Sequence, residues 1–402
     1  MHDVTSFGGA VLVWGLVGTA ALFGRHVARW IKIPAPAVFL LAAAIAANSI
    51  KAVRTAVDLH LVENVVTLAL IVILFDGGLH LGRRRFREAA VPIVALGVLG
   101  TFATTALIAL VSHTIFGLDW KFAAVLGAAL APTDPAVVFA VLSDKNLTGR
   151  TSAVLEGESG FNDPAGIALL LGFVQLATHK HGSIAVVLGN FAIEMAVGCA
   201  VGITGGLGLR RLLSPRRPNL EAPQPLLALA GILALYGFAT VAHGSGFLAV
   251  LIAGIVMGDA ISGEAPAVET FHATLASLGE IVAFVLLGIT VRLHTLVEHH
   301  AWLIGLGLFA ILTLVLRPIV CVPLLRALRL ERRQTTFIAW AGLKGAVPIL
   351  LGALAVSGGV PDAARLYAIV FVVVTLSVVV QGGSLAWVAQ KLGVGIDSAG
   401  QD

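Results

Sequence analysis

The feature that most restricts the fold of this chain is its succession of long apolar windows. They lie near 8–24, 33–50, 61–81, 89–116, 120–143, 151–178, 183–209, 225–243, 246–262, 271–291, 301–325, 334–357 and 364–390. A helix needs about 20 apolar residues to cross a bilayer. Hydrophobic residues make up 58% of the 402 residues and charged residues only 12%, against about 25% charged in soluble proteins. The sequence therefore predicts an all-α polytopic membrane protein with about thirteen transmembrane helices.

The basic residues favour one side of the predicted membrane. Most of the 26 Lys and Arg residues fall in alternate loops, at 25–32, 83–87, 145–150, 210–217 and 326–333. The positive-inside rule makes these loops cytoplasmic. We therefore expect a multi-pass protein of the cell inner (plasma) membrane, with its amino terminus outside and its carboxyl terminus in the cytoplasm. This distribution explains the basic excess without nucleic acid, for which the chain carries no binding motif.

The chain also divides into two halves, 1–213 and 214–402, at the Pro-rich loop SPRRPNLEAPQP. Segment 69–83 resembles segment 279–293, and the same offset carries the PTDP span onto the span with GLKGAVP. Because the spans between the copies are odd in number, we expect the second copy to be inverted. Paired broken segments of this kind indicate a transporter site. We expect no soluble domain after the last span.

The stretch 127–172 combines an apolar background with ionisable side chains. Its polar residues and helix breakers are Thr133, Asp134, Glu158, Ser159, Asn162, Asp163, Pro132, Pro135 and Pro164. Ionisable groups inside a membrane usually face a cavity or a pathway, because hydrocarbon cannot solvate them. We therefore expect an ion-binding site on these two consecutive spans.

Asp163 is the central candidate for this site. Ser159 lies four residues before Asp163, so both side chains face the same side of a helix. A carboxylate removed from water is costly unless it binds a proton or a cation. One carboxylate cannot hold both at once, so competition would produce an obligatory exchanger. The alternative is a structural role for Asp163 as a helix cap or ion-pair partner.

Thr133 and Asp134 stand between two prolines in the middle of a span. Proline removes a backbone donor and moves the preceding residue out of helical geometry. Unwinding there would free carbonyl oxygens that suit sodium or potassium. Thr133 would offer its hydroxyl or its carbonyl. Asp134 is either a second ligand or a cap for the amino terminus of a half-helix.

Two basic residues lie inside predicted spans, Lys344 in GLKGAVP and Arg317 in LRP. A buried Lys344 needs a partner, and Glu158 is the partner that we prefer. Arg317 either pairs with Glu158 instead or extends to the interface from a helix end. Asp76, in FDGGL at the end of the 61–81 window, either joins the site or lines its cytoplasmic approach.

The motifs PTDPAVVFAVL, LEGESGFNDP, FDGGL and GLKGAVPI together resemble the monovalent cation:proton antiporters. The similar branch contains the bacterial NhaP proteins and the animal sodium/proton exchangers, and the resemblance covers nearly the whole chain. It implies a homodimer and a thirteen-span fold of two inverted repeats with crossed, unwound helices. The pair Asn162–Asp163 matches the Asn-Asp motif of this branch, which implies electroneutral one-for-one exchange.

The resemblance also implies roles for single residues. Asp163 would carry the cation or the proton, with Thr133, Ser159 and Asp134 contributing to coordination. Glu158 would pair with the basic residue of the family's G-L-R-G motif. That position is Lys344 here, where the family usually has Arg, so the fork geometry of a guanidinium is lost. The proline after Asn-Asp and the GAVPI ending are similar to the potassium/proton subgroup.

We therefore expect an antiporter that exchanges Na⁺ or K⁺ for H⁺ and uses no cofactor. The sequence contains no Walker loop, nucleophile elbow, zincin motif or haem ligation pattern, so we do not expect an enzyme. A cation channel and a non-transporting ion or pH sensor on the same scaffold are the alternatives. The choice between Na⁺, K⁺ and Li⁺ stays open at this point.

Overall fold

The structure is a computed structural model that describes residues 34–50, 53, 57–135, 138, 149–178, 183–213, 223–261 and 265–394. The predicted span 8–24 and the loop between the two halves therefore lie outside the described residues. All regular secondary structure in the described ranges is helical. This confirms the all-α fold class.

The helices follow the chain as a nearly continuous series. The α-helices are α2 (Ala35–Ser49), α4 (Leu59–Val94), α5 (Thr101–Thr114), α6 (Trp120–Leu130), α8 (Gly149–Thr178), α9 (Ile184–Leu212), α10 (Gln224–Val241), α11 (Gly246–Ile261), α12 (Pro266–Thr290), α13 (Leu293–Val297), α14 (Ala301–Ile311), α15 (Arg317–Ala327), α16 (Arg332–Trp340), α17 (Ala346–Ser357), α18 (Ala363–Leu376) and α19 (Gly383–Leu392). Three π-helical segments, η1 (Ala95–Gly100), η4 (Leu312–Leu316) and η5 (Ser377–Gly382), continue neighbouring α-helices, and η3 (Glu298–His300) is a 3₁₀ turn.

Seven helical stretches in the described ranges are long and apolar enough to cross a membrane. They are Leu59–Thr114, Gly149–Thr178, Ile184–Leu212, Gln224–Val241, Pro266–Thr290, Ala301–Ala327 and Ala363–Leu392. Four shorter apolar helices accompany them: Ala35–Ser49, Trp120–Leu130, Gly246–Asp259 and Ala346–Ser357. Helices occupy all of the predicted windows that the structure describes, and the protein is a multi-pass membrane protein.

The longest stretch is broken at Gly82, inside α4. Gly82 has a φ of 56°, in the left-handed region where a glycine meets no steric penalty. The backbone N–H of Arg84 then donates to Asp259 Oδ2, from the end of α11, at 3.1 Å. A Cβ at Gly82 would lie 2.6 Å from Asp259 Oδ1, so a larger residue would clash. The carboxylate thus accepts an amide that the break leaves without a partner in its own helix.

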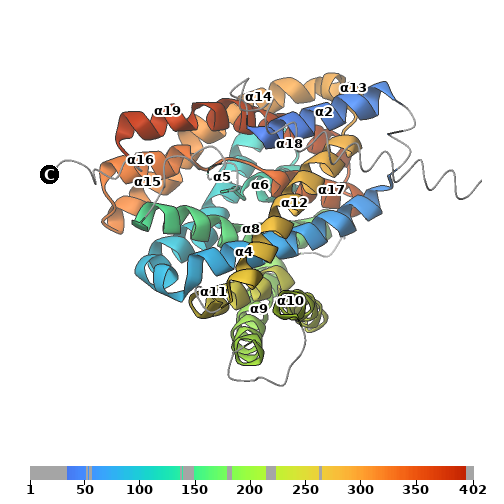
Figure 1. The fold of residues 1–402 in the computed structure, drawn as a ribbon. Coiled ribbons are helices and arrows are strands. Elements are labelled where there is room, and N and C mark those ends of the chain that lie inside the picture. The colour runs from blue at the N-terminus through green and yellow to red at the C-terminus, as the bar shows by residue number, and fades with distance from the viewer. Residues whose placement is uncertain are drawn as a thin grey trace, which may run out of the picture.

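The helices differ strongly in how far they are covered. Figure 1 shows α9 and α10 at one end of the molecule and α13 and α14 at the other, with α4, α8 and α12 between them. Only 17% of the residues in the windows of α9 and α10 are buried, against 72% in the window of α8. Exposed apolar side chains on α9 and α10 suit lipid tails, which are as apolar as leucine. The polar residues of α8 are therefore enclosed by other helices.

Candidate functional site

Two interrupted spans meet at the centre of the molecule. The first unwinds between α6 and residue 138, where residues 131–135 have no helical assignment, and the second unwinds at 341–345 between α16 and α17. The backbone N–H of Asp134 donates to the carbonyl oxygen of Leu343 at 2.8 Å, which joins the two unwound segments. Pro132 and Pro135 explain the first interruption, because neither residue has an N–H to continue a helix.

Each half-helix end faces a side chain from the other interrupted span. Lys344 Nζ donates to the carbonyl oxygens of Ala131 and Pro132, both at 2.9 Å, at the carboxyl end of α6. The carboxylate of Asp134 lies against Gly345, the N-cap residue of α17, where a Cβ would overlap it. A cation at the carboxyl end of a helix and an anion at the amino end both interact favourably with the helix dipole. This placement matches the capping role that the sequence analysis left open for Asp134.

A hydrogen-bonded cluster joins the first unwound segment to α8. The backbone N–H of Thr133 donates to Asn162 Oδ1 at 3.3 Å, and Asn162 Nδ2 donates to Thr133 Oγ1 at 2.7 Å. The hydroxyls of Thr133 and Ser159 lie 3.2 Å apart. All three residues are buried. The structure therefore brings together the hydroxyl and amide groups that the sequence analysis assigned to one site.

Asp163 lies beside this cluster on α8 and is also buried, with 6% of its surface exposed. Its Oδ1 atom has no hydrogen-bond partner among the described residues. Asp134 and Lys344 are close enough for their charges to act on the Asp163 carboxylate. A buried carboxylate oxygen without a donor is costly, and a bound cation or proton relieves that cost.

The partner of Glu158 differs from the one that the sequence analysis preferred. Arg317, at the start of α15, forms an ion pair with Glu158 at 2.5 Å, and both side chains are almost fully buried. Lys344 bonds to the carbonyl oxygens of α6 instead. Arg317 therefore does not extend to an interface. The preference for Lys344 was wrong because the register of helices distant in sequence decides which cation meets Glu158.

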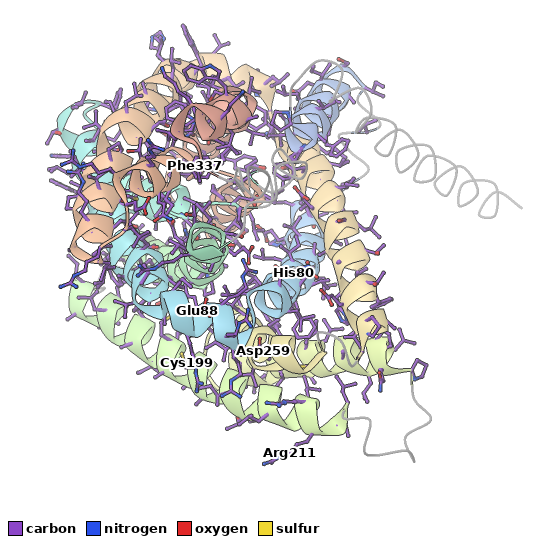
Figure 2. All side chains as sticks on the ribbon, turned by 60° about the vertical axis from the view of Figure 1, so that its left-hand side comes forward. His80, Glu88, Cys199, Arg211, Asp259 and Phe337 are labelled. Carbon is purple, nitrogen blue, oxygen red and sulfur yellow. The ribbon has the colours of Figure 1, made fainter. Side chains whose placement is uncertain are left out.

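Asp76 belongs to a different cluster and lies inside α4, before the break at Gly82, not at a helix end. Its Oδ1 is 3.5 Å from His80 Nδ1. His80 also lines a cavity of about 540 Å³ together with Asp259 and Glu269. Figure 2 labels His80 and Asp259. Both roles of Asp76, as a ligand and as a residue of the cytoplasmic approach, stay predictions.

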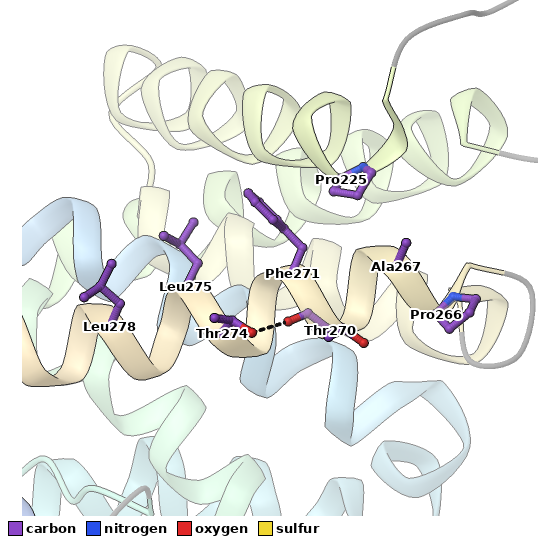
Figure 3. A pocket seen from close by; sticks show the side chains of 8 residues that line it. All are labelled: Pro225, Pro266, Ala267, Thr270, Phe271, Thr274, Leu275 and Leu278. Carbon is purple, nitrogen blue, oxygen red and sulfur yellow. Dashed lines mark hydrogen bonds between the residues drawn. The ribbon is translucent and has the colours of Figure 1, made fainter. Parts of the chain in front are cut away.

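A second hollow lies between the start of α10 and α12, and it is apolar. Figure 3 shows its lining, formed by Pro225, Pro266, Ala267, Thr270, Phe271, Thr274, Leu275 and Leu278. The hydroxyl of Thr274 donates to the carbonyl oxygen of Thr270 and is thus used within α12. Among the described residues, none with a charged side chain lines this groove of about 630 Å³.

Two polar residues near the crossing were not found from the sequence. Ser377 and Gln381, on η5, are buried and bond to the second interrupted span. The available signal was a pair of polar side chains four residues apart in an otherwise apolar window. The π-helical segments also border the site: η1 packs against α8, η4 runs directly into Arg317, and η5 carries Ser377. Such segments often occur at functional sites.

Comparison with known proteins agrees with this geometry. The chain is 33% identical to the K⁺/H⁺ antiporter NhaP of Alkalimonas amylolytica, and the match covers 95% of this chain and 66% of that protein. It is 29% identical to the K⁺/H⁺ antiporter NhaP2 of Shewanella sp. (strain ANA-3), over 96% of this chain and 68% of that one. The chain thus spans about two thirds of the length of these relatives.

A solved structure shares the fold. The sodium proton antiporter MjNhaP1 from Methanocaldococcus jannaschii at pH 8 superposes with a TM-score of 0.79 at 22% identity, over 95% of this chain and 99% of that one. The family model described as "Sodium/hydrogen exchanger, transmembrane" matches residues 17–391. The crossed half-helices, the buried Asn-Asp pair and this match together show that the chain belongs to the transmembrane sodium/hydrogen exchanger family.

Proposed function

We propose that this protein is an antiporter that exchanges one monovalent cation, Na⁺ or K⁺, for one proton. The observation that carries the proposal is Asp163, a buried carboxylate beside the Thr133–Asn162–Ser159 cluster, with one oxygen that has no hydrogen-bond partner in the part of the chain that the structure describes. Cation and proton would compete for this single group. If only the occupied forms cross between inward-facing and outward-facing states, the competition couples the two fluxes.

The formal charges around the crossing support a one-for-one exchange. Glu158 and Arg317 cancel each other as an ion pair. Asp134 and Lys344 have opposite charges and lie at opposite half-helix ends. Asp163 then leaves one negative charge, which one monovalent cation or one proton neutralises. Because each 100 mV of potential costs about 2.3 kcal/mol per net charge moved, one-for-one exchange avoids that cost.

The ligands proposed for the cation are hard oxygen atoms. Asp163 would supply its carboxylate, and Thr133 and Ser159 would supply hydroxyl or carbonyl oxygens. Oxygen ligands of this kind suit Na⁺ and K⁺ equally well in chemical type. The names of the NhaP and NhaP2 relatives favour K⁺. The 27% identical low-affinity Na⁺/H⁺ antiporter NhaS1 of Synechocystis sp. keeps Na⁺ as the second candidate.

The membrane placement is part of the same proposal. The loop charges favour an inner (plasma) membrane location with the amino terminus outside and the carboxyl terminus in the cytoplasm. The two interrupted spans that meet at residues 134 and 343 support halves at 1–213 and 214–402, related by an inverted repeat. We also propose a homodimer, on the family resemblance. Labelling of single introduced cysteines from either side, and native mass measurement, test these points.

The deciding experiment is proton flux into proteoliposomes that hold a pH-sensitive dye. Wild-type protein and Asp163→Asn would receive Na⁺, K⁺ or Li⁺ in turn. Proton movement triggered by cation in the wild type and absent in the variant is the expected result. The ranking of the three ions would then identify the substrate. A potential-sensitive dye in the same vesicles should stay silent if the exchange is electroneutral.

Two other outcomes would support the alternatives. Cation flux without counter-movement of protons would indicate a channel. If vesicles with folded wild-type protein or with folded Asp163→Asn protein are no more permeable to ions than empty vesicles, the protein is a non-transporting sensor. Either outcome would refute the proposed exchange.

A further inference from the structure

A small polar cluster lies at the centre of an apolar helix, next to the crossing. Ser377 is completely buried and Gln381 is 2% exposed. Both belong to η5, the π-helical segment that joins α18 to α19. Burying an amide and a hydroxyl in a membrane helix is costly unless both form hydrogen bonds. Their partners therefore show what these residues do.

The cluster holds both ends of the second unwound segment. The backbone N–H of Lys344 donates to Ser377 Oγ at 2.9 Å. The Ser377 hydroxyl donates in turn to Gln381 Oε1 at 2.6 Å. Gln381 Nε2 donates to the carbonyl oxygen of Trp340, the last residue of α16, at 3.1 Å. Residues 341–343 thus lie between Trp340 and Lys344, whose backbones are both hydrogen-bonded to η5.

A further contact fixes the same end of α16. The indole Nε1 of Trp340 donates to Ser384 Oγ at 3.2 Å, and Ser384 Oγ donates to the carbonyl oxygen of Gln381 at 3.0 Å. The helix formed by α18, η5 and α19 therefore holds Trp340 in place through its carbonyl oxygen and through its ring. Since η5 is continuous with α18 and α19, this support is part of a long helix, not of a loop.

The position of Lys344 matters because its side chain reaches the cation site. Its Nζ bonds to the carbonyl oxygens of Ala131 and Pro132, directly before Thr133. Its charge also acts on Asp163. A shift of the Lys344 backbone would therefore change both the first unwound segment and the field at the carboxylate.

We propose that Ser377 and Gln381 are positioning residues that hold residues 340–344 in place and thereby set the affinity of the Asp163 site for its cation. The inference rests on the proposed antiport and deepens it. Neither residue needs to touch the cation, because both act through the backbone of the segment that carries Lys344.

The test compares Ser377→Ala, Gln381→Met and Ser377→Thr with the wild-type protein. Thr375→Val is the matched control, since Thr375 lies on the same helix and its hydroxyl has no hydrogen-bond partner among the described residues. In proteoliposomes, the half-saturating cation concentration and the maximal rate are measured separately. In the full-length solubilised protein, hydrogen exchange of the amides in 341–345 is measured, which does not depend on transport.

Ser377→Ala and Gln381→Met each remove two buried hydrogen bonds. The half-saturating cation concentration should therefore rise by about tenfold or more in both variants, with the maximal rate within about twofold. Amide exchange in 341–345 should accelerate in both variants by a similar factor. Ser377→Thr keeps the hydroxyl and should restore wild-type values, and Thr375→Val should match the wild type.

The inference is overturned if amide exchange in 341–345 is unchanged in Ser377→Ala, or if Thr375→Val has an equal effect. An unchanged half-saturating concentration in an active Ser377→Ala protein would overturn it as well. Absence of cation-driven proton flux in the wild-type protein would instead refute the proposed antiport. The amide hydrogen exchange would then still show whether Ser377 and Gln381 hold residues 341–345 in place. If Gln381→Met does not fold, the three variants at 375 and 377 suffice.

Discussion

Arg317 Nη1 lies 2.5 Å from Glu158 Oε1, and both side chains are almost fully removed from solvent. The pair joins α15 to α8, the helix that carries Ser159, Asn162 and Asp163. Because the charge of Arg317 is neutralised by Glu158, Arg317 does not also balance the charge of Asp163. The ion pair therefore supports the site without using the oxygen atoms proposed as cation ligands.

Removing one member of this pair should destabilise the protein severely. Glu158→Gln or Arg317→Met leaves one buried charge alone, which costs about 3–5 kcal/mol. The double variant Glu158→Gln/Arg317→Met removes both charges and should recover most of the loss. Thermal unfolding of detergent-solubilised protein measures the effect. Arg326→Ala, at an exposed position, is the control and should change stability by no more than about 0.5 kcal/mol. Equal effects of the single and double variants would contradict the pairing.

Lys344→Met should lose transport, because two carbonyl oxygens at the end of α6 lose their donor. Unpartnered buried acceptors cost about 1–3 kcal/mol each, and the field at Asp163 also changes. Lys344→Arg keeps the charge and should retain part of the activity. Cation-driven proton flux and melting temperature are measured side by side. Full activity in Lys344→Met would show that the charge is not needed at the crossing.

Thr133→Val should weaken cation binding while preserving the fold. The substitution keeps the shape of the side chain but removes the hydroxyl that meets Asn162 Nδ2 and Ser159 Oγ. Because two hydrogen bonds and a proposed cation ligand are lost with this hydroxyl, we expect the half-saturating cation concentration to rise about tenfold or more. Thr133→Ser retains the hydroxyl and should stay close to the wild type. Identical values for Thr133→Val and Thr133→Ser would exclude the hydroxyl from the site.

Gly345→Ala should disrupt the crossing. Its Cβ would overlap the Asp134 side chain, whose backbone N–H is held by Leu343. The two unwound segments would have to separate, so both transport and stability should fall. Gly208→Ala is the matched control on α9, where a Cβ meets nothing within 4 Å and alanine favours the helix by about 1 kcal/mol. A Gly345→Ala protein with wild-type flux would contradict the close contact.

Competition between proton and cation predicts the direction of the pH effect. Lowering the pH raises the fraction of Asp163 that holds a proton, so more cation is needed to reach half of the maximal rate. The half-saturating cation concentration should therefore rise as the pH falls, while the maximal rate at saturating cation changes less. Flux measured at several pH values, with equal pH on both sides at the start, gives this relation. Independence from pH would argue against a shared carboxylate.

The fold class and most of the candidate site could be predicted from local sequence patterns. Apolar windows are a property of consecutive residues, since a helix must satisfy its own backbone groups in lipid. The first interruption was equally local, because Pro132 and Pro135 remove two backbone donors within four residues. Pro164 was expected to break its helix as well, but α8 continues through it. Thr133, Ser159, Asn162 and Asp163 were grouped on the same grounds, and the structure brings them together.

The side-chain pairings depend on the arrangement of helices that are distant in sequence. Arg317 and Lys344 are both cations inside predicted spans, and the arrangement of the helices places Arg317 beside Glu158 and Lys344 at the end of α6. Asp76, a candidate in the sequence, lies beside His80, whereas Gln381, which the sequence did not single out, bonds to the second interrupted span. Side-chain partners across distant helices depend on helix register and rotation, which the pattern of apolar residues does not encode.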